Sequence, residues 1–252
     1  MIPEMIRDGL HRAPTDLLPS DRLIVALDFP DTGAALALVD RLHGATRWLK
    51  VGLELYIAEG NSLVAELKRR GYSVFLDLKL HDIPNTVASA VRSATRLGVD
   101  MLTVHAAGGP EMIGAAVGAA ESRLTLLAVT VLTSMDADQL EAIGVAGTPA
   151  AQVERLATMA LAHGVGGFVC SPNEVASLRR RLGNEPLLVI PGIRPQGADI
   201  GDQRRVATPA AAIASGASYL VVGRPITRAE DPEAAARAIL EEMQSGIGIG
   251  PA

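Results

Sequence analysis

The sequence predicts an α/β protein that folds as a single (β/α)8 barrel. Short apolar segments alternate with longer helix-like segments from Arg22 onward, which implies parallel strands joined by right-handed crossovers. Eight such units in 252 residues match the size of this barrel. The alternative is an open doubly wound sheet, which usually has a glycine-rich turn after its first strand. Here the first strand is followed by Asp28-Phe29-Pro30-Asp31.

The expected strands are short apolar runs, as suits parallel strands that are buried on both faces. They cover Leu23–Leu27, Trp48–Val51, Val74–Leu78, Met101–Val104, Leu124–Val131, Gly167–Cys170, Leu187–Ile190 and Tyr219–Val222. The expected helices cover Thr32–Leu42, Asn61–Arg70, Asn85–Leu97, Glu111–Glu121, Ala150–His163, Asn173–Arg181, Gly201–Ser215 and Asp231–Met243. Glycines that can end a helix lie at or near five of these ends, at Gly71, Gly98, Gly164, Gly183 and Gly216.

Composition excludes several classes of protein. Acidic residues outnumber basic ones by 28 to 23, which argues against a nucleic-acid surface, although a small anion could still bind a local basic pocket. No apolar run is long enough to cross a bilayer, so no membrane partner is expected. The single cysteine, Cys170, excludes an internal disulfide and fits a reducing cytoplasm. We expect Cys170 to be a small buried hydrophobe rather than a nucleophile.

Residues 1–20 are predicted to form a short extension in front of a barrel domain that covers residues 21–252. The extension mixes charged residues such as Glu4, Arg7 and Asp8 with apolar ones and has no continuous apolar core, so it does not match a secretory signal. No linker or shift in composition divides the rest of the chain.

Polar residues fall at the same end of successive predicted strands, the end at which barrels of this kind form their active sites. These ends carry Asp28, Lys50, Asp77 with Lys79, His105, Thr130 with Thr133 and Ser134, Cys170 with Ser171, Gly192 with Arg194, and Gly223 with Arg224. Asp77 and Lys79 are two residues apart and therefore share one face of their strand. A buried charge costs several kcal/mol unless it is paired. An alternating Asp/Lys array at this end therefore indicates catalysis.

Two similar motifs follow the last two strands and indicate an anion site. Pro191-Gly192-Ile193-Arg194-Pro195 follows the seventh strand, and Val222-Gly223-Arg224-Pro225 follows the eighth. Barrels often bind phosphate with these two loops. Glycine lets backbone N–H groups approach an anion, and Arg224 can pair with it in a bidentate manner.

The segment from Phe75 to Thr86, Phe-Leu-Asp-Leu-Lys-Leu-His-Asp-Ile-Pro-Asn-Thr, resembles the signature of the orotidine 5′-phosphate decarboxylase family. The Asp-x-Lys-x-x-Asp core is shared with sister sugar-phosphate enzymes. The continuation Ile-Pro-Asn-Thr, together with Leu-Thr-Ser and Pro-Gly-Ile-Arg-Pro, favours the orotidylate branch. The resemblance covers nearly the whole chain from Arg22.

This resemblance implies that the chain converts orotidine 5′-monophosphate (OMP) to uridine 5′-monophosphate (UMP), the last step of de novo UMP synthesis, with no metal or organic cofactor. It also implies a homodimer in which Asp82 and Thr86 reach into the partner's site. The remaining matches assign Asp28 to the ribose, Lys50 to the second strand, Thr133 to the pyrimidine loop, and Arg194, Gln203, Gly223 and Arg224 to the phosphate. The loop from Gln196 to Arg205 would then be a phosphate clamp.

The reaction sets the roles expected of the charged array. Loss of carbon dioxide leaves negative charge on a ring carbon, and without a cofactor the protein must stabilise that charge and supply a proton. Lys79 suits both tasks, because its ammonium is a compact charge and a donor. Asp77 and Asp82 would keep Lys79 protonated and oriented, while Lys50 would bridge Asp77 and the ribose hydroxyls.

Several alternatives remain open at this point. A magnesium-dependent sugar-phosphate decarboxylase or aldolase of the same suprafamily shares the Asp/Lys core. A catalytically silent nucleotide-binding protein on the same scaffold is the other alternative, and the intact Asp/Lys array argues against it. His81 has the opposite strand parity to Lys79, so we expect it to play a structural or supporting role. His105 could line the pocket or pack against it. Arg204 and Arg205 are expected to be solvated.

Overall fold

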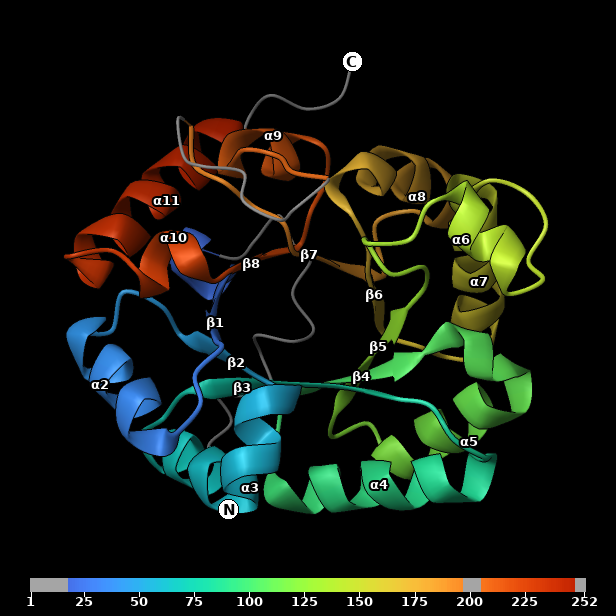
Figure 1. The fold of residues 1–252 in the computed structure, drawn as a ribbon, viewed down its shortest axis with the longest axis horizontal. Helices are drawn as coiled ribbons and strands as arrows, with labels where there is room; N and C mark the ends of the chain where they lie inside the picture. The colour runs from blue at the N-terminus through green and yellow to red at the C-terminus, as the bar shows by residue number, and fades with distance from the viewer. Residues whose placement is uncertain (1–17, 197–204, 248–252) are drawn as a thin grey trace.

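The computed structural model describes residues 18–196 and 205–247, and its strands form one closed parallel barrel (Figure 1). Each strand pairs with its sequence neighbour, and β1 closes the ring against β8. The strands are β1 (Leu23–Leu27), β2 (Trp48–Gly52), β3 (Ser73–Leu80), β4 (Met101–His105), β5 (Thr125–Val129), β6 (Gly167–Val169), β7 (Leu187–Ile190) and β8 (Tyr219–Val222). The predicted (β/α)8 barrel is therefore confirmed, with every expected strand near its predicted bounds.

The helices surround the barrel, and most lie where the sequence predicts them (Figure 1). They are α2 (Thr32–Arg41), α3 (Leu53–Arg69), α4 (Pro84–Leu97), α5 (Gly109–Ala120), α6 (Ala137–Ala142), α7 (Pro149–Ala162), α8 (Val175–Leu182), α9 (Pro209–Ala214), α10 (Arg224–Thr227) and α11 (Pro232–Gly246). Short 3-10 helices cover η3 (Pro19–Asp21), η4 (Ala106–Gly108) and η5 (Pro172–Glu174). The expected helix-ending glycines all have positive φ, at Gly71, Gly98, Gly164, Gly183 and Gly216.

Two helix predictions need correction, and two short helices are additional to those expected. The helix expected from Asn61 is the second half of α3, which begins at Leu53 and is interrupted at Gly60, whose φ of 63° is not helical. The helix expected from Gly201 begins only at Pro209 in the described residues, because Thr208 caps it by accepting from the backbone N–H of Ala211. The short helices α6 and α10 were not predicted.

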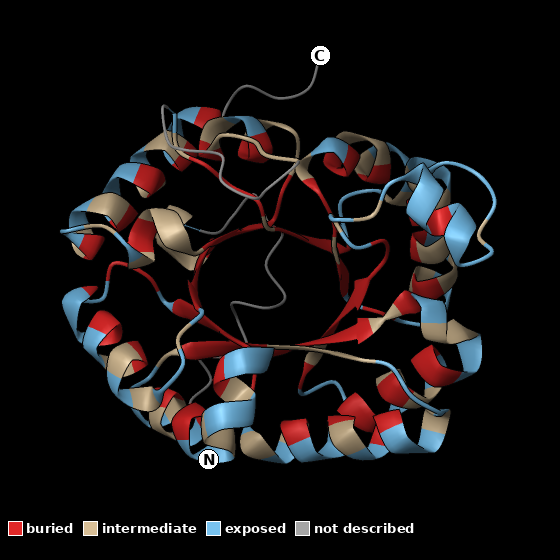
Figure 2. Cartoon of the chain, viewed as in Figure 1, coloured by how far each residue is buried: buried red, intermediate tan, exposed pale blue. Residues whose placement is uncertain are grey.

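The core has two parts separated by the wall of the barrel. One lies between the strands and the helices, whose inward faces are buried and outward faces exposed (Figure 2). The other fills the inside of the barrel with Ile24, Ala26, Trp48, Phe75, Met101, Leu127, Leu187, Val189, Tyr219 and Val221. Where a strand contributes two of these residues, as β1, β7 and β8 do, they lie two positions apart, so the next inward position on each strand is two residues nearer the carboxyl end.

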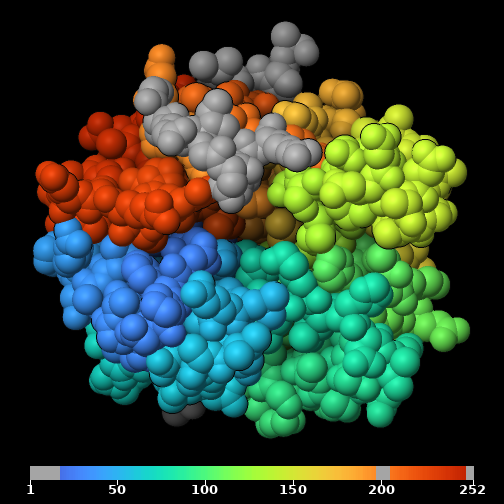
Figure 3. Space-filling model, viewed as in Figure 1, coloured from blue at the N-terminus to red at the C-terminus, as the bar shows by residue number. Residues whose placement is uncertain are grey.

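Closure brings the two ends of the described chain together. Leu23, Ile24 and Val25 of β1 pair with Leu220, Val221 and Val222 of β8. In the space-filling view the blue first segments lie against the red last segments (Figure 3). Residues at the carboxyl ends of β1 and β8 therefore share one opening, called here the mouth. Among the described residues, no helix has the length and apolar character needed to cross a membrane.

Candidate active site

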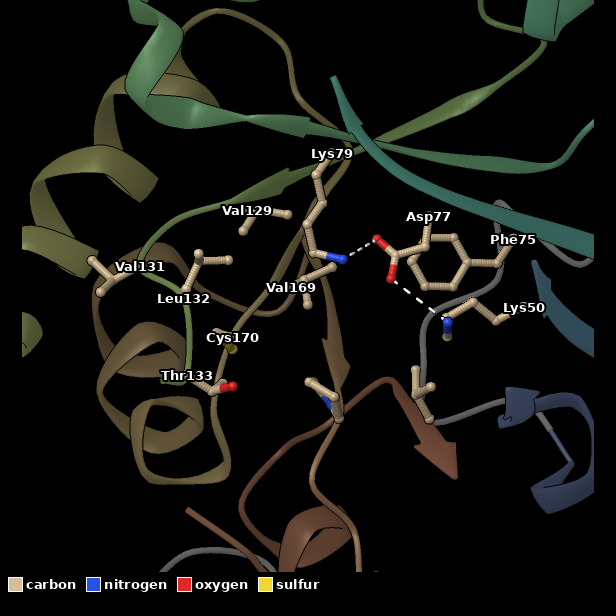
Figure 4. Close-up of a pocket in the computed structure, with 12 residues that line it drawn as sticks. Lys50, Phe75, Asp77, Lys79, Val129, Val131, Leu132, Thr133, Val169 and Cys170 are labelled. Atoms are coloured by element: carbon tan, nitrogen blue, oxygen red, sulfur yellow. Dashed lines mark hydrogen bonds and ion pairs between the residues drawn. The ribbon is translucent and has the colours of Figure 1, made fainter. Parts of the chain in front are cut away.

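Four charged side chains form a continuous array at the mouth, on the first three strands. Lys79 Nζ donates to Asp77 Oδ1 at 2.7 Å, and Lys50 Nζ lies 3.0 Å from Asp28 Oδ1 and 3.8 Å from Asp77 Oδ2. Figure 4 shows Lys79 and Lys50 pointing at the two oxygens of Asp77 from opposite sides. The array is most buried at its centre, since Lys50 and Asp77 are 11% and 15% exposed, against 31% for Lys79 and 62% for Asp28.

The backbone of β3 bends at Lys79. The pairing of β3 with β4 shifts register between Leu76 and Leu80, and Lys79 has a φ of 50°, in the left-handed region that a lysine seldom adopts. A hydroxyl on β4 holds the bend, because Thr103 Oγ1 accepts from Lys79 N at 2.8 Å and donates to Asp77 Oδ1 at 2.9 Å. The strand therefore aims Lys79 at Asp77 through a bulge rather than through regular alternation.

Gly52 provides the space in which the Lys50 ammonium lies. It pairs with Asp77 in the β2–β3 register and so occupies an inward position between Asp28 and Asp77. A Cβ atom at residue 52 would lie 3.0 Å from Lys50 Nζ and 3.4 Å from Asp28 Oδ1. The missing side chain therefore lets one ammonium reach both carboxylates.

The array keeps Asp77 ionised. Burial alone would raise the pKa of Asp77, but the charges of Lys50 and Lys79 and the hydrogen bonds from Lys79 and Thr103 outweigh it and hold the pKa below its usual value. The ionised Asp77 carboxylate contacts the ammonium groups of both Lys50 and Lys79. The site thus presents a fixed negative charge beside an ammonium that can donate a proton.

Two cavities open beside this array and share the wall formed by Lys50, Pro191 and Val221. The smaller, of about 180 Å³, contains Asp77 and Lys79 on one side and Leu132, Thr133, Cys170 and apolar strand residues on the other (Figure 4). The larger, of about 410 Å³, is lined by Asp28, Gly192, Arg194, Gly223, Arg224, Thr227 and Arg228 among others. An elongated ligand could therefore place a neutral ring in one cavity and an anionic group in the other.

The remaining predicted site residues are distributed as follows. Arg194, Gly223 and Arg224 line the larger cavity, and Thr133 lines the smaller one. Asp82 and Thr86 are exposed and line neither cavity, and the Asp82 carboxylate accepts from the backbone N–H of Ile83. Gln203 lies outside the described residues.

His81, His105 and Cys170 lie near the charged array but are not part of it. The rings of His81 and His105 lie 5.4 Å apart, and neither lines the two cavities. Burial, with the nearby His81 and Lys79, lowers the pKa of His105. Cys170 is fully buried in the cavity wall, and burial raises the pKa of its thiol, which confirms it as an inert apolar group.

Sequence reasoning missed three residues. Thr103 occupies the inward position after Met101 on β4, so strand parity could have identified it. Arg228 lines the larger cavity from the end of α10, which was not predicted. Arg205 was expected in solvent, but its side chain is only 17% exposed and is paired with Glu174 at 2.5 Å. No motif in the sequence marks that pair, whose members lie 31 residues apart.

The described residues contain no group of three or more His, Cys, Asp or Glu side chains arranged to hold a metal ion. The carboxylates of the mouth are instead engaged by lysines. Asp77 contacts both Lys50 and Lys79, and Asp28 contacts Lys50. In the described part of the mouth, Asp28 and Asp77 are therefore each in contact with at least one ammonium group.

Comparison with known proteins agrees with this geometry. The sequence profile of the OMPdecase family, described as orotidine 5′-phosphate decarboxylase / HUMPS, matches residues 21–239. An orotidine 5′-phosphate decarboxylase from Anaeromyxobacter sp. (strain K) is 57% identical over 221 residues, which are 88% of this chain and 97% of that protein. One from Halorhodospira halophila is 57% identical over 225 residues, with 88% and 95% covered.

The fold has close counterparts among solved structures. The crystal structure of orotidine 5′-phosphate decarboxylase from Lactobacillus acidophilus superposes with a TM-score of 0.80 at 40% identity and covers 88% of this chain and 99% of that one. Since the profile spans most of the chain and the relatives are matched almost end to end, the chain belongs to the orotidine 5′-phosphate decarboxylase / HUMPS family.

Proposed function

We propose that this protein decarboxylates OMP to UMP and carbon dioxide, in pyrimidine biosynthesis, without a metal or organic cofactor. One observation carries the proposal: the Lys79 ammonium is held 2.7 Å from the Asp77 carboxylate in the wall of a small, largely apolar cavity. That cavity adjoins a second one lined by arginines. Relatives at 57% identity carry the name of this enzyme.

The chemistry assigned to Lys79 is proton donation. As the bond between the ring carbon and the carboxylate breaks, carbon dioxide leaves and its bonding electrons stay on the ring carbon. Lys79 stabilises this charge and then donates a proton from Nζ to that carbon. Asp77 orients Lys79 by accepting a hydrogen bond from Nζ, and Lys79, which is 31% exposed, can recover a proton from solvent after the transfer.

The two cavities assign the rest of the substrate. The pyrimidine would lie in the smaller cavity against Thr133, and the phosphate in the larger one near Arg194 and Arg224. The ribose would lie between them at Asp28 and Lys50, whose polar groups can bond its hydroxyls. Phosphate contacts far from the ring can still accelerate the reaction, because their binding energy is available to orient the ring.

We further propose a homodimer that acts in the cytoplasm. Asp82 and Thr86 are exposed at the mouth's edge, and Ile83 between them is 66% exposed, as expected of residues that serve a partner's site. Mixing inactive Asp82→Ala chains with inactive Lys79→Ala chains should restore activity, because one of the two sites in a mixed dimer would then be intact. A mixture that stays inactive while exchanging subunits would contradict a shared site.

The decisive experiment is an absorbance assay with OMP in the presence of a chelator. We expect the pyrimidine absorbance to change as OMP becomes UMP, at a rate that the chelator does not alter. Loss of activity with the chelator, restored by magnesium, would favour the metal-dependent relatives. UMP binding without OMP turnover would favour a silent nucleotide-binding protein.

The phosphate site can be tested separately with Arg224→Ala. We expect this variant to bind UMP at least tenfold more weakly, since a charged hydrogen bond contributes about 1.5–3 kcal/mol. Its affinity for uridine, which lacks the phosphate, should match that of the wild type. Unchanged UMP affinity would place the phosphate elsewhere.

A further inference from the structure

Arg205 joins three active-site loops through one guanidinium group. Nη1 donates to Glu174 Oε1 at 2.5 Å and to Ser171 Oγ at 3.3 Å, in the loop after β6. On the loop after β5, Nε donates to Thr133 O at 3.3 Å, and Nη2 donates to Met135 O at 3.1 Å and Leu132 O at 3.4 Å. Arg205 itself lies between β7 and α9.

The acceptors on the loop after β5 belong to one turn, residues 131–135. Met135 N donates to Leu132 O at 2.9 Å, so the turn is closed on itself and its carbonyl groups converge on Arg205. The side chains of Leu132 and Thr133 from the same turn line the smaller cavity. The guanidinium is therefore bonded to the backbone of the turn whose Leu132 and Thr133 side chains line the cavity with Lys79 (Figure 4).

Glu174 anchors the guanidinium on the side away from the turn. Its side chain is 6% exposed, and its second oxygen accepts from Ser171 N at 2.8 Å, so the carboxylate is fixed by the start of η5. A buried carboxylate of this kind needs a cation. Charge pairing alone would be satisfied by any cation, whereas bonds to the three carbonyl groups of the turn need the planar fork of arginine.

We propose that Arg205 is a positioning residue for the pyrimidine half of the site: it fixes the 131–135 turn so that Thr133 and Leu132 meet the ring, and it does so by the shape of its guanidinium as well as by its charge. This inference rests on the proposed function, which assigns the ring to the smaller cavity. It predicts that disturbing Arg205 weakens recognition of the ring far more than recognition of the phosphate, because Arg194 and Arg224 line the other cavity.

Two ligands separate these effects in calorimetric titrations: UMP, which has the ring, and ribose 5-phosphate, which lacks it. Arg205→Lys keeps the charge opposite Glu174 but loses the fork. The double variant Arg205→Met with Glu174→Gln removes both charges and so leaves no orphaned buried carboxylate, which keeps the barrel folded for the measurement. Arg180→Ala, which removes an exposed arginine from α8, is the matched control. Circular dichroism confirms folding in each case.

We expect both Arg205 variants to bind UMP at least tenfold more weakly than the wild type, with ribose 5-phosphate affinity within twofold, and the control to match the wild type for both ligands. Wild-type UMP affinity in Arg205→Lys would show that charge is sufficient and overturn the inference. An equal loss for both ligands would also overturn it, because it would indicate general damage. A wild-type protein that fails to bind UMP would overturn the proposed function itself.

Discussion

Two lysine–aspartate pairs of nearly equal length lie at opposite ends of the barrel. At the mouth, Lys79 Nζ is 2.7 Å from Asp77 Oδ1, and at the amino-terminal end Lys68 Nζ is 2.6 Å from Asp100 Oδ2. The same Asp100 oxygen also accepts a hydrogen bond from the backbone, from Val74 N at 2.8 Å. The Asp77 carboxylate instead accepts from two side chains, those of Lys79 and Thr103, and it lines the smaller cavity.

The neighbouring charges repeat this contrast. At the amino-terminal end the buried Arg22 donates to the carbonyl groups of Ser218 and Ala217, and Arg179 donates to those of Gly216 and Pro186. Burial lowers the pKa of Arg179 to about 10, so it remains charged at neutral pH. Buried charge alone therefore does not identify a functional site. Charges bonded to the backbone tie segments together, whereas charges bonded to one another beside a cavity are available to a ligand.

The largest expected effect comes from removing the lysine of each pair. Lys79→Ala should lower kcat at least about a thousandfold, or about 4 kcal/mol of barrier, because the proton donor and its charge are lost. Lys68→Ala should leave kcat near the wild-type value and lower stability, because Asp100 loses its cation. Steady-state assays and urea unfolding of both variants check the contrast. Near-normal turnover in Lys79→Ala would end the functional assignment of the mouth.

Arg22→Met tests whether the amino-terminal end is purely structural. Two buried carbonyl groups would lose a charged donor, and we expect the free energy of unfolding to fall by about 3 kcal/mol. Thermal unfolding should then shift down by roughly 10 °C. At a temperature where the variant is folded, kcat and KM should equal those of the wild type. A change in KM without a loss of stability would break the contrast between the two ends.

Gly52→Ala tests how tightly the array is packed. The backbone of Gly52 has a φ of −93°, which alanine adopts without strain, so the new methyl group acts only through its contact with Lys50 Nζ. Displacing that ammonium should lower kcat/KM about tenfold to a hundredfold, or about 1.4–2.8 kcal/mol. Gly44→Ala, at an open position with a φ of 77°, should lower stability slightly and leave kcat/KM unchanged. Equal activities in both variants would argue against the packing role.

A smaller effect concerns pH. Because the folded pKa of Asp77 is depressed, its contribution to stability is complete above its unfolded pKa, about 3.9, and is lost as pH falls through the folded value. The stability difference between the wild type and Asp77→Asn should therefore be constant near neutral pH and shrink below about pH 4. Denaturant unfolding between pH 7 and pH 3 measures it. A difference that grows on acidification would reverse the assigned sign.

The smallest effects distinguish two threonines of the barrel. Among the described buried side chains, the Thr130 hydroxyl is without a hydrogen-bond partner, so Thr130→Val should change stability by less than about 0.5 kcal/mol or raise it. Thr103→Val has the same shape change but removes two bonds, to Lys79 N and Asp77 Oδ1, and should lower kcat. Calorimetric unfolding and steady-state kinetics of the two variants measure these effects. An equal loss of kcat in both would show that the hydrogen bonds of Thr103 are not what matters.

The fold was predictable because each strand is a short apolar run between helix-length segments, and a barrel follows from their number and order. The predicted helix boundaries were wrong where a local backbone conformation or a capping hydrogen bond overrides the pattern of apolar residues. Gly60 interrupts α3 without ending it, and Thr208 delays α9 until Pro209. Strand alternation predicted that Asp77 and Lys79 meet, and they do, but through a bulge with a positive φ at Lys79 that depends on Thr103 of the next strand and that alternation could not predict.

Site residues that lie in a strand or next to one were predicted well, whereas residues positioned by distant contacts were not. Lys50 and Asp77 lie within β2 and β3, Asp28 directly follows β1, and Arg224 lies just after β8, so the barrel fixes where all four lie. The role of Arg205 depends on Glu174 and on carbonyl groups of a distant turn, and carbonyl groups leave no signature in a sequence. The shared site at Asp82 and Thr86 rests on a second chain, so it stays a prediction.

The wall shared by the two cavities has a thermodynamic consequence. A ligand that fills both touches the first three strands and the last two at once, and these strands meet only at the β1–β8 seam. Such a ligand can bind only while the seam is closed, so its binding free energy adds to the free energy of unfolding of the whole barrel. Ligand binding at the mouth and closure of the β1–β8 seam are therefore thermodynamically coupled, so that each favours the other.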